Sequence, residues 1–320
     1  MTSRREFLSV ASLAATGLVL SPLAGCGVEA PPAGTAATPA PPPPLTGPMI
    51  TRAIPSTGEM LPVIGAGTSG SYEVAMGSPE YQALEEVVRI FFEGGGSVID
   101  TAPMYSNAEE VVGSLLESGG WRDRCFLATK LVAREDTSFQ QQWEESLRRL
   151  RTDHVELLAV HNMNNMAEAL PFARELKEQG LVKYVGITHG QTSAQAQMLQ
   201  AMQDEKPDFI QINYSVNAPA AASRLFPTAQ DLGIAVMVNR AFDDGRLFGR
   251  VGGRALPGWA AELGITSWSQ MFLKFVISQP AVTVVIPATG KPERQADQLR
   301  AGHGELLSRA QQDELVGMFA

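Results

Sequence analysis

The sequence predicts an α/β protein, a (β/α)8 or TIM barrel with an N-terminal β-hairpin, over residues 49–320. From Met49 onward, short apolar segments alternate with amphipathic ones, as expected for a parallel sheet covered by helices. Eight apolar segments in about 270 residues match the usual size of this barrel. Three of them end on or just before a polar residue, which fits a fold whose active sites lie at the C-terminal ends of strands.

The N-terminal residues 1–26 resemble a targeting segment rather than part of the fold. Ser3–Leu8, with its paired arginines, resembles a twin-arginine export signal, and the apolar run Val10–Leu20 is too short for a typical membrane span. Leu23–Cys26 resembles a lipobox, in which Cys26 becomes the lipidated N-terminus. We therefore expect export by the twin-arginine translocase to the periplasm and membrane attachment through Cys26. The alternative is an ordinary secretory signal with an incidental cysteine.

Residues 27–48 form a Pro/Ala-rich linker. The run Pro39–Pro44 stands among Ala, Gly and Thr, a composition that cannot bury a core and favours an extended, partly polyproline tether. The alternative is a spacer that follows a cleaved signal.

The elements of the barrel follow in order. Ile50–Ile54 and Met60–Ile64, separated by Pro55–Gly58, predict a hairpin that closes the bottom of the barrel. The eight predicted strands are Val63–Gly67, Ser97–Asp100, Phe126–Lys130, Val155–His161, Val182–Thr188, Phe209–Tyr214, Ile234–Asn239 and Val282–Ile286. The predicted helices include Glu80–Glu93, Phe139–Leu150, Met166–Gln179, Thr192–Gln203 and Gln311–Phe319. Glycines after several helices predict left-handed C-caps, at Gly94–Gly96, Gly180 and Gly233.

Composition excludes several classes of function. The formal net charge of -9 argues against nucleic-acid binding, which favours a basic face, and the 44% hydrophobic content fits a globular body with a large core. The two cysteines, Cys26 and Cys125, cannot form a disulfide framework, and no cysteine or histidine spacing indicates a metal site.

Four polar side chains stand where three predicted strands end. Asp100 ends one strand, Tyr105 follows five residues later, Lys130 ends the next strand and His161 ends the third. Taken singly, each has a structural explanation: a helix cap, a packed phenol, a solvated amine and a buried histidine. Together at one face of a barrel they indicate a catalytic site.

These side chains suit the reduction of a carbonyl group. Tyrosine, with a pKa of about 10, is a reluctant proton donor, and a neighbouring ammonium improves it by stabilising the phenolate. Asp100 would hold Lys130 charged beside Tyr105, and His161 would orient and polarise the carbonyl. The hydride must come from a cofactor, because no side chain supplies one.

With these motifs the chain resembles the aldo/keto reductase family from Met49 to Phe319. The resemblance is carried by Leu61–Thr68, Ser97–Tyr105, Asn107–Gly113, Lys130, Asp153–His161, Val185–Thr188, Gln211–Tyr214 and Ile286–Arg294. The family implies a monomer that binds NADPH without a Rossmann domain or a metal. It makes Tyr105 the acid and Asp100, Lys130 and His161 its supporting residues.

The resemblance also implies a set of cofactor contacts around the nicotinamide: Gly67, Thr68, Thr188, His189, Gln211, Asn239 and Arg240. Two positions depart from the family. Thr188-His189 replaces the usual Ser-Asn pair, and Asn239 stands where an aromatic residue often stacks on the nicotinamide. The following Arg240 is a candidate to stack there instead.

A second set of contacts, toward the adenosine, lies in one segment: Pro287, Thr289, Lys291, Arg294, Asp297 and Gln298. Arg294 aligns with the family residue near the 2′-phosphate, and Asp297-Gln298 replaces the usual Glu-Asn pair facing the adenine. We expect NADP(H), with NAD(H) as the alternative. The structural alternative for Lys291 and Arg294 is a solvated first helical turn.

The expected function is reduction of aldehydes or ketones to alcohols by NADP(H)-dependent hydride transfer, with Tyr105 as general acid. Its alternative is an exported cofactor-binding accessory or sensor protein of the same fold with little turnover, a hypothesis that the altered positions near Thr188 and Asn239 keep open. The partners expected are a small carbonyl substrate and the translocase.

Overall fold

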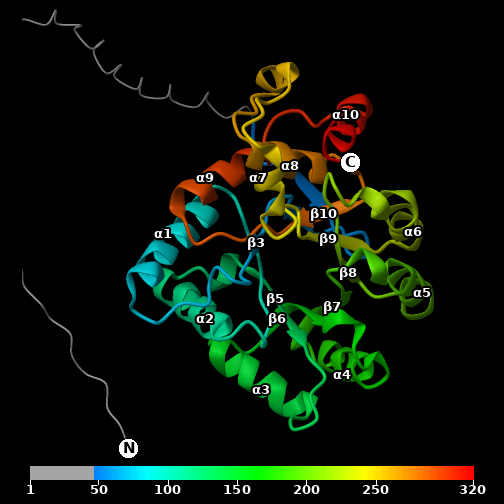
Figure 1. Cartoon of the computed structure of the whole chain (residues 1–320). Helices are drawn as coiled ribbons and strands as arrows, with labels where there is room; N and C mark the ends of the chain where they lie inside the picture. The colour runs from blue at the N-terminus through cyan, green and yellow to red at the C-terminus, as the bar shows by residue number, and fades with distance from the viewer. Residues whose placement is uncertain (1–46) are drawn as a thin grey trace, which may run out of the picture. The chain divides into compact units, whose positions relative to one another are not determined.

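Eight parallel strands form the central sheet of the computed structural model, which describes residues 47–320 (Figure 1). Neighbouring strands follow the order β10-β9-β8-β7-β6-β5-β4-β3, and bridges from Ile64 to Val285 and from Gly67 to Ala288 close the sheet. The strands are β3 Ala66–Gly67, β4 Val98–Asp100, β5 Phe126–Leu131, β6 Val155–Val160, β7 Val182–Thr188, β8 Phe209–Asn213, β9 Ala235–Asn239 and β10 Val282–Val285. The predicted barrel is confirmed, with strand bounds within three residues of those expected.

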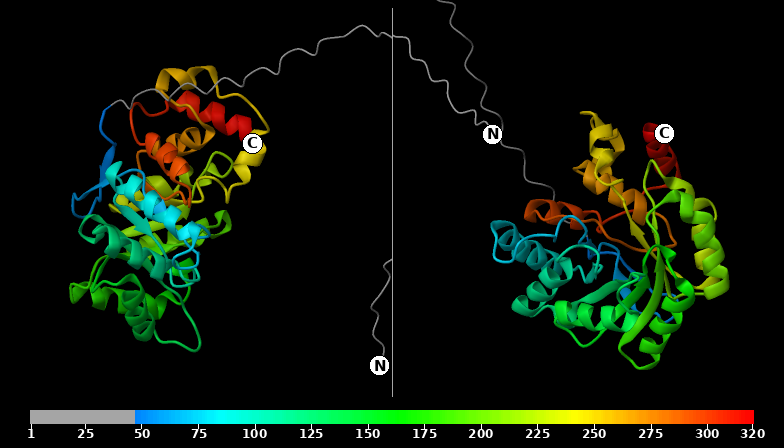
Figure 2. Two further views of the ribbon diagram at one scale, coloured as in Figure 1. Left: turned by 90° about the vertical axis from the view of Figure 1, so that its left-hand side faces the viewer. Right: turned by 60° about the horizontal axis from the view of Figure 1, so that its bottom comes forward.

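Helices surround the barrel, as Figures 1 and 2 show. They are α1 Pro79–Glu93, α2 Ala108–Gly119, α3 Phe139–Leu150, α4 Met166–Glu178, α5 Gln195–Glu205, α6 Leu225–Leu232, α7 Arg246–Val251, α8 Trp268–Ile277, α9 Pro292–Arg300 and α10 Arg309–Phe319. The helix expected from Thr192 begins as the 3-10 turn Thr192–Ala194 before α5. Gly233 has the expected left-handed backbone, with φ of 67°, whereas in the triplet after α1 it is Gly95, not Gly94, that is left-handed.

The N-terminal hairpin, β1 Thr51–Ala53 and β2 Met60–Pro62, lies at the end of the barrel where the strands begin. Arg52 fastens it there by donating to the Ile277 carbonyl at 2.5 Å, at the end of α8, and to the Gln279 carbonyl at 2.6 Å, just after that helix. The guanidinium thereby pairs the Ile277 carbonyl, which lies in the last turn of a helix, and shares the Gln279 carbonyl with Val282 N. The hairpin prediction is confirmed.

Inside the barrel, this same end is filled by aromatic side chains. The rings of Phe126 and Tyr184 stack with centroids 5.8 Å apart, and Phe209 lies edge-on to Tyr184 at 5.5 Å. Tyr184 Oη donates to Glu59 Oε2 at 2.6 Å, which ties this group to the hairpin. Because the hairpin and the aromatic rings occupy this end, a site inside the barrel has to open at the other.

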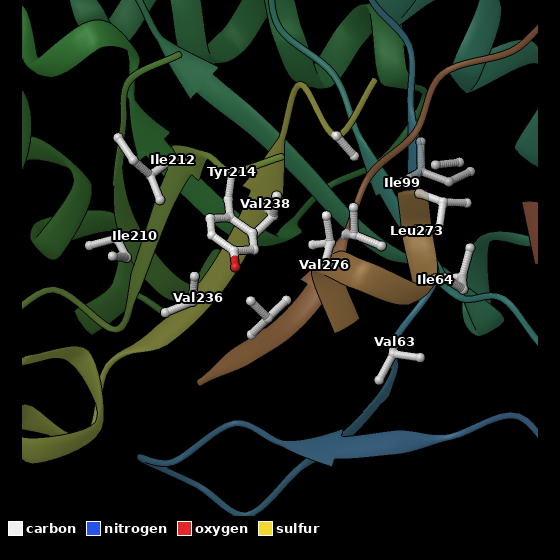
Figure 3. Close-up of a cluster of buried hydrophobic side chains, with 14 of the residues drawn as sticks. Val63, Ile64, Ile99, Ile210, Ile212, Tyr214, Val236, Val238, Leu273 and Val276 are labelled. Atoms are coloured by element: carbon white, nitrogen blue, oxygen red, sulfur yellow. The ribbon is translucent and has the colours of Figure 1, made fainter. Parts of the chain in front are cut away.

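Alternation along the strands separates the outer core from the barrel interior. Figure 3 shows Ile210, Ile212, Val236 and Val238 in the apolar cluster that also includes Leu273 and Val276 of α8. Side chains of a strand point alternately to opposite faces, so the intervening residue Gln211 points inward. The polar residues of the interior are placed by this alternation.

Residues 1–46 lie outside the described residues, and with them the twin-arginine signal, the lipobox-like Cys26 and most of the tether. No helix in the part of the chain from Gly47 to Ala320 is long and apolar enough to cross a bilayer.

Candidate active site

Three of the four predicted catalytic residues come from neighbouring strands at the same end of the barrel. Asp100 ends β4, Lys130 is the penultimate residue of β5, and His161 follows β6 directly. Asp100 and Lys130 are buried, whereas His161 is partly exposed. Tyr105 lies in the loop between β4 and α2 and is also partly exposed. The structure therefore places two charged groups inside and two reactive rings at the mouth.

A buried ion pair lies at the centre of this group. Lys130 Nζ donates to Asp100 Oδ2 at 2.7 Å and to the Thr101 carbonyl at 2.7 Å. The other carboxylate oxygen accepts from Gln211 Nε2 at 2.9 Å, and Thr188 Oγ1 donates to Gln211 Oε1 at 2.8 Å. Side chains from β4, β5, β7 and β8 are thus joined across the barrel, and both oxygens of Asp100 are satisfied.

The ammonium of Lys130 remains charged in spite of its burial. Burial by itself lowers the pKa of Lys130, but the attraction of Asp100, together with the hydroxyl of Tyr105, outweighs it and raises that pKa. Lys130 Nζ lies 5.3 Å from the centroid of the Tyr105 ring. A fixed positive charge is therefore held next to the phenol, where it stabilises the phenolate that forms when a proton is donated.

The ring of His161 lies close to that of Tyr105 at the same end of the barrel. Its ring centroid lies 6.2 Å from that of Tyr105, with the two rings nearly perpendicular at 88°. Burial, followed by the positive charges of Lys130 and His189, lowers the pKa of His161 to about 4. The imidazole is therefore neutral at neutral pH, and it can donate one hydrogen bond to a carbonyl oxygen without carrying a charge.

The loop that carries Tyr105 is short and turned sharply. Tyr105 N donates to the Ala102 carbonyl at 3.1 Å, and the next residue, Ser106, has a left-handed backbone with φ of 47°. Asn107 Nδ2 donates to the Val74 carbonyl at 2.6 Å, which ties the loop to the segment before α1. The direction of the phenol therefore depends on where α2 begins, because the loop leads straight into that helix.

The residues expected near the nicotinamide lie beside this network, at the ends of β7, β8 and β9. Asn239, on β9, is the register partner of Asn213 on β8, a residue that the sequence analysis did not assign to the site. Asn239 Nδ2 lies 3.4 Å from both the His189 carbonyl and Gln211 Oε1. The Oδ1 atoms of both asparagines are buried and have no hydrogen-bond partner among the described residues. Unpaired buried acceptors are costly, so these oxygens fit a ligand that brings N–H donors, such as a carboxamide.

Arg240 lies at the rim next to His189. Its backbone is left-handed, with φ of 53°, and its guanidinium pairs with Asp244 at 3.2 Å. A Cβ added to Gly190 would lie 2.9 Å from Arg240 Nε, so the side chain runs along the Gly190 backbone. Burial, followed by the charge of Arg240, lowers the pKa of His189.

The two cofactor contacts predicted at the end of the first barrel strand, Gly67 and Thr68, both make close contacts within the protein. Thr68 Oγ1 donates to Thr101 Oγ1 at 2.9 Å and to the Asp100 carbonyl at 3.1 Å, so this buried hydroxyl supports the strand that carries Asp100. A Cβ at Gly67 would lie 2.8 Å from the Ile286 carbonyl oxygen, which explains the glycine by the close approach of β3 to the segment after β10.

The segment expected to face the adenosine is divided between exposed cations and internal contacts. Lys291 and Arg294, at the start of α9, are exposed and have no ion-pair partner in the described part of the chain. Asp297 instead accepts from Ser267 Oγ at 2.7 Å and Gln270 Nε2 at 2.6 Å, which joins α9 to the start of α8. Pro287 accepts from Gly67 N at 2.9 Å. The two other predicted residues of this segment, Thr289 and Gln298, are buried.

Sequence reasoning gave no role to several residues that support the site. The carbonyl of Thr101 accepts from Lys130 Nζ, and its hydroxyl oxygen accepts from Thr68 Oγ1. Glu109, in the first turn of α2, is buried and accepts from Thr129 Oγ1 at 2.7 Å. The signal for Glu109 was its place in the Asn107–Gly113 stretch directly after Tyr105.

A separate cavity of about 700 Å³ lies at the opposite end, where the strands begin, and contains none of the four predicted catalytic residues. Charged groups at its wall are paired with one another or with neighbours, for example Lys183 with Glu59 at 2.7 Å and Lys177 with Asp208 at 2.6 Å. This cavity is therefore not the candidate active site.

The aldo/keto reductase family model matches residues 63–317. Among solved structures, an aldo-keto reductase from Klebsiella pneumoniae in complex with NADPH has a TM-score of 0.72 and 26% identity, and the match covers 85% of this chain and 96% of that one. A second, from the same organism in complex with NADP and acetate, has a TM-score of 0.69 and 26% identity, with 82% and 93% covered.

The sequence relatives match over smaller parts of this chain. An aldo-keto reductase of Mycobacterium avium is 28% identical over 75% of this chain and 80% of its own length. A methylglyoxal reductase of Yersinia pestis is 31% identical over 41% of this chain and 46% of its own, and a putative aryl-alcohol dehydrogenase of Saccharomyces cerevisiae is 27% identical over 39% of each. The chain thus spans less than half the length of several curated relatives that it matches.

The depressed pKa of His161 predicts a pH dependence of stability. The folded state keeps this imidazole neutral down to about pH 4, whereas the unfolded chain binds the proton near pH 6.5. Stability should therefore fall as the pH falls from 6.5 to 4, because the unfolded state then binds more protons. His161→Gln should make that fall less steep, measured by urea unfolding at several pH values. Parallel slopes for the two proteins would contradict the neutral histidine.

Proposed function

Because the chain belongs to the aldo/keto reductase family, we propose that it is an NADP(H)-dependent reductase that converts aldehydes or ketones to alcohols. The observation that carries the proposal is the buried Lys130–Asp100 pair, 2.7 Å apart, with its ammonium beside the half-buried ring of Tyr105. A charge held under a phenol at the open end of a barrel supports proton donation to an oxygen that gains charge.

In this mechanism Tyr105 donates its hydroxyl proton to the carbonyl oxygen as that oxygen becomes an alkoxide. Lys130 stabilises the phenolate left behind, and Asp100 keeps the ammonium in place. His161, neutral at neutral pH, donates a hydrogen bond that orients the carbonyl. NADPH, when bound, supplies the hydride to the carbonyl carbon.

The residues present fit such a dinucleotide. At one end, the unpaired Oδ1 atoms of Asn213 and Asn239 match the carboxamide donors of a nicotinamide. At the other, the exposed cations Lys291 and Arg294 at the start of α9 match a phosphate, since helix N-termini and guanidinium groups both favour anions. The NADP(H) complexes of the two Klebsiella pneumoniae structures support the choice of cofactor.

The activity is tested with purified protein, NADPH and a reactive aldehyde such as 4-nitrobenzaldehyde, by following the loss of NADPH absorbance. Turnover across a panel of aldehydes and ketones would identify the substrate class. Tight NADPH binding without turnover of any of them would instead support the accessory or sensor protein.

Replacement of Tyr105 by Phe should remove the proton donor. We expect a fall in the reduction rate of about a hundredfold or more, the usual contribution of a general acid, with NADPH affinity near that of the wild type. The matched control is Tyr184→Phe, which removes another phenol, bonded to Glu59 at 2.6 Å, at the opposite end of the barrel. Retention of most of the rate by Tyr105→Phe would show that another group donates the proton.

Replacement of Arg294 by Ala tests the choice between NADPH and NADH. If its guanidinium binds the 2′-phosphate, the dissociation constant for NADPH should rise by about tenfold, as expected for a charged hydrogen bond, while that for NADH changes little. Arg309→Ala, at an exposed arginine of α10 that pairs with Asp313, is the matched control. Equal losses for both cofactors, measured by fluorescence titration, would remove Arg294 from this role.

We also propose that the enzyme is exported to the periplasm with its cofactor bound and held at the membrane through Cys26. Twin-arginine transport carries folded proteins, and a ligand at a hundred times its dissociation constant stabilises the fold by about 2.7 kcal/mol. A lipoprotein cysteine carries several acyl chains, which firm anchoring requires. The support for this proposal is the sequence of residues 1–26.

Cell fractionation tests the export. An Arg4→Lys/Arg5→Lys double variant should stay in the cytoplasm, and Cys26→Ala should be exported but released from the membrane. Protein recovered from outside the cytoplasm should carry nucleotide through purification. Exported protein that is free of nucleotide would contradict transport in the loaded state.

A further inference from the structure

We propose that Glu109 and Thr129 are positioning residues, which set the geometry between Tyr105 and Lys130 through one buried hydrogen bond; the inference rests on the proposed reduction. Glu109 is the second residue of α2 and lies four positions after Tyr105. Thr129 directly precedes Lys130 on β5. The Thr129 hydroxyl donates to Glu109 Oε1 at 2.7 Å, and the two residues are 0% and 1% exposed.

This bond closes a ring around the loop that carries the phenol. At its start the loop is attached to β5 from inside the barrel, because Lys130 Nζ donates to Asp100 and to the Thr101 carbonyl. At its end the loop enters α2, and Glu109 attaches α2 to β5 from outside the barrel. Adjacent residues of one strand point to opposite faces, so Thr129 and Lys130 hold the two ends of the same loop.

The other contacts of α2 are non-directional or act farther from Tyr105, as does the bond between Ser114 Oγ and Tyr81 Oη at 2.8 Å. Its apolar face packs through Val111, Val112, Leu115 and Leu116, and apolar packing is non-directional. Gly113 allows close approach to α3, since an added Cβ would lie 2.3 Å from the Arg149 carbonyl oxygen. Asn107, at the N-cap, makes no capping bond, and its Nδ2 donates instead to the Val74 carbonyl, which ties the loop to the segment before α1 and not to β5. The bond to Thr129 is directional, and it acts within one turn of Tyr105.

A carboxylate is an unfavourable choice if only packing is needed at this position. Burial raises the pKa of Glu109, against the hydroxyls of Thr129 and Ser146, which lower it. Arg149 Nη1 is 3.8 Å from Glu109 Oε2 and is a shared partner, since its Nε donates to Glu145 at 2.7 Å. Buried charged groups can often be replaced by apolar residues without loss of stability, so packing does not explain the carboxylate. Its bond to β5 does.

The decisive variant is Thr129→Val, which keeps the shape of the side chain and removes the donor. We expect kcat to fall by roughly tenfold or more, because a misplaced reacting group costs rate, while KM and the NADPH dissociation constant stay nearly unchanged. Proton transfer should become more rate-limiting, so the solvent isotope effect on kcat should increase. Thr129→Ser, which keeps the hydroxyl, should restore the wild-type rate.

Thr283→Val is the matched control, since Thr283 is a buried threonine on β10 whose hydroxyl accepts from Val236 N at 3.2 Å. It should lower stability without a selective fall in kcat. The proposal is overturned if Thr129→Val keeps the wild-type kcat and isotope effect, or if Thr129→Ser is as slow as Thr129→Val. A wild-type protein that binds NADPH but reduces no carbonyl compound would contradict the proposed function instead, and NADPH binding by the variants separates the two outcomes.

Discussion

The ion pair between Lys130 and Asp100 is the interaction on which the rest of the site depends. Taking two charges out of water costs several kcal/mol for each, and their attraction compensates only when every remaining donor and acceptor is satisfied. Here Gln211 supplies the second partner of the carboxylate and Thr101 a second partner of the ammonium. The pair therefore requires three strands, β4, β5 and β8, in correct positions. In return it holds a positive charge beside Tyr105.

The need to satisfy every polar atom of this buried ion pair explains the contrast between the two ends of the barrel. At the end where the strands begin, Phe126, Tyr184 and Phe209 fill the interior and the hairpin lies nearby. At the other end, polar side chains replace apolar ones on the inward positions of β4, β5 and β8. There the interior holds a buried charge beside the partly exposed rings of Tyr105 and His161, so stability and chemistry occupy different ends of one fold.

The charges around the mouth act on each other as well as on a ligand. Burial and the positive charge of Lys130 keep His161 neutral, and burial and Arg240 act in the same direction on His189. With Lys291 and Arg294 at the start of α9, basic side chains gather at this end of a chain whose formal net charge is -9. Positive charge around the site attracts an anionic ligand. The imidazole of His161 is neutral, so the proton donor of the site is Tyr105.

The sequence by itself determined the barrel, the hairpin and the strand ends that carry Asp100, Lys130 and His161. These features follow from local patterns: apolar runs of strand length, helical spacing between them, and a polar residue where three of the runs stop. The tertiary structure alone decided which polar groups meet. Gln211 reaches Asp100 across 111 positions of sequence, Asp297 turns to Ser267 and Gln270 rather than remaining free, and Glu109 meets Thr129. A hydrogen bond depends on the distance and direction between two atoms, and for residues far apart in the chain only the packed strands and helices set them.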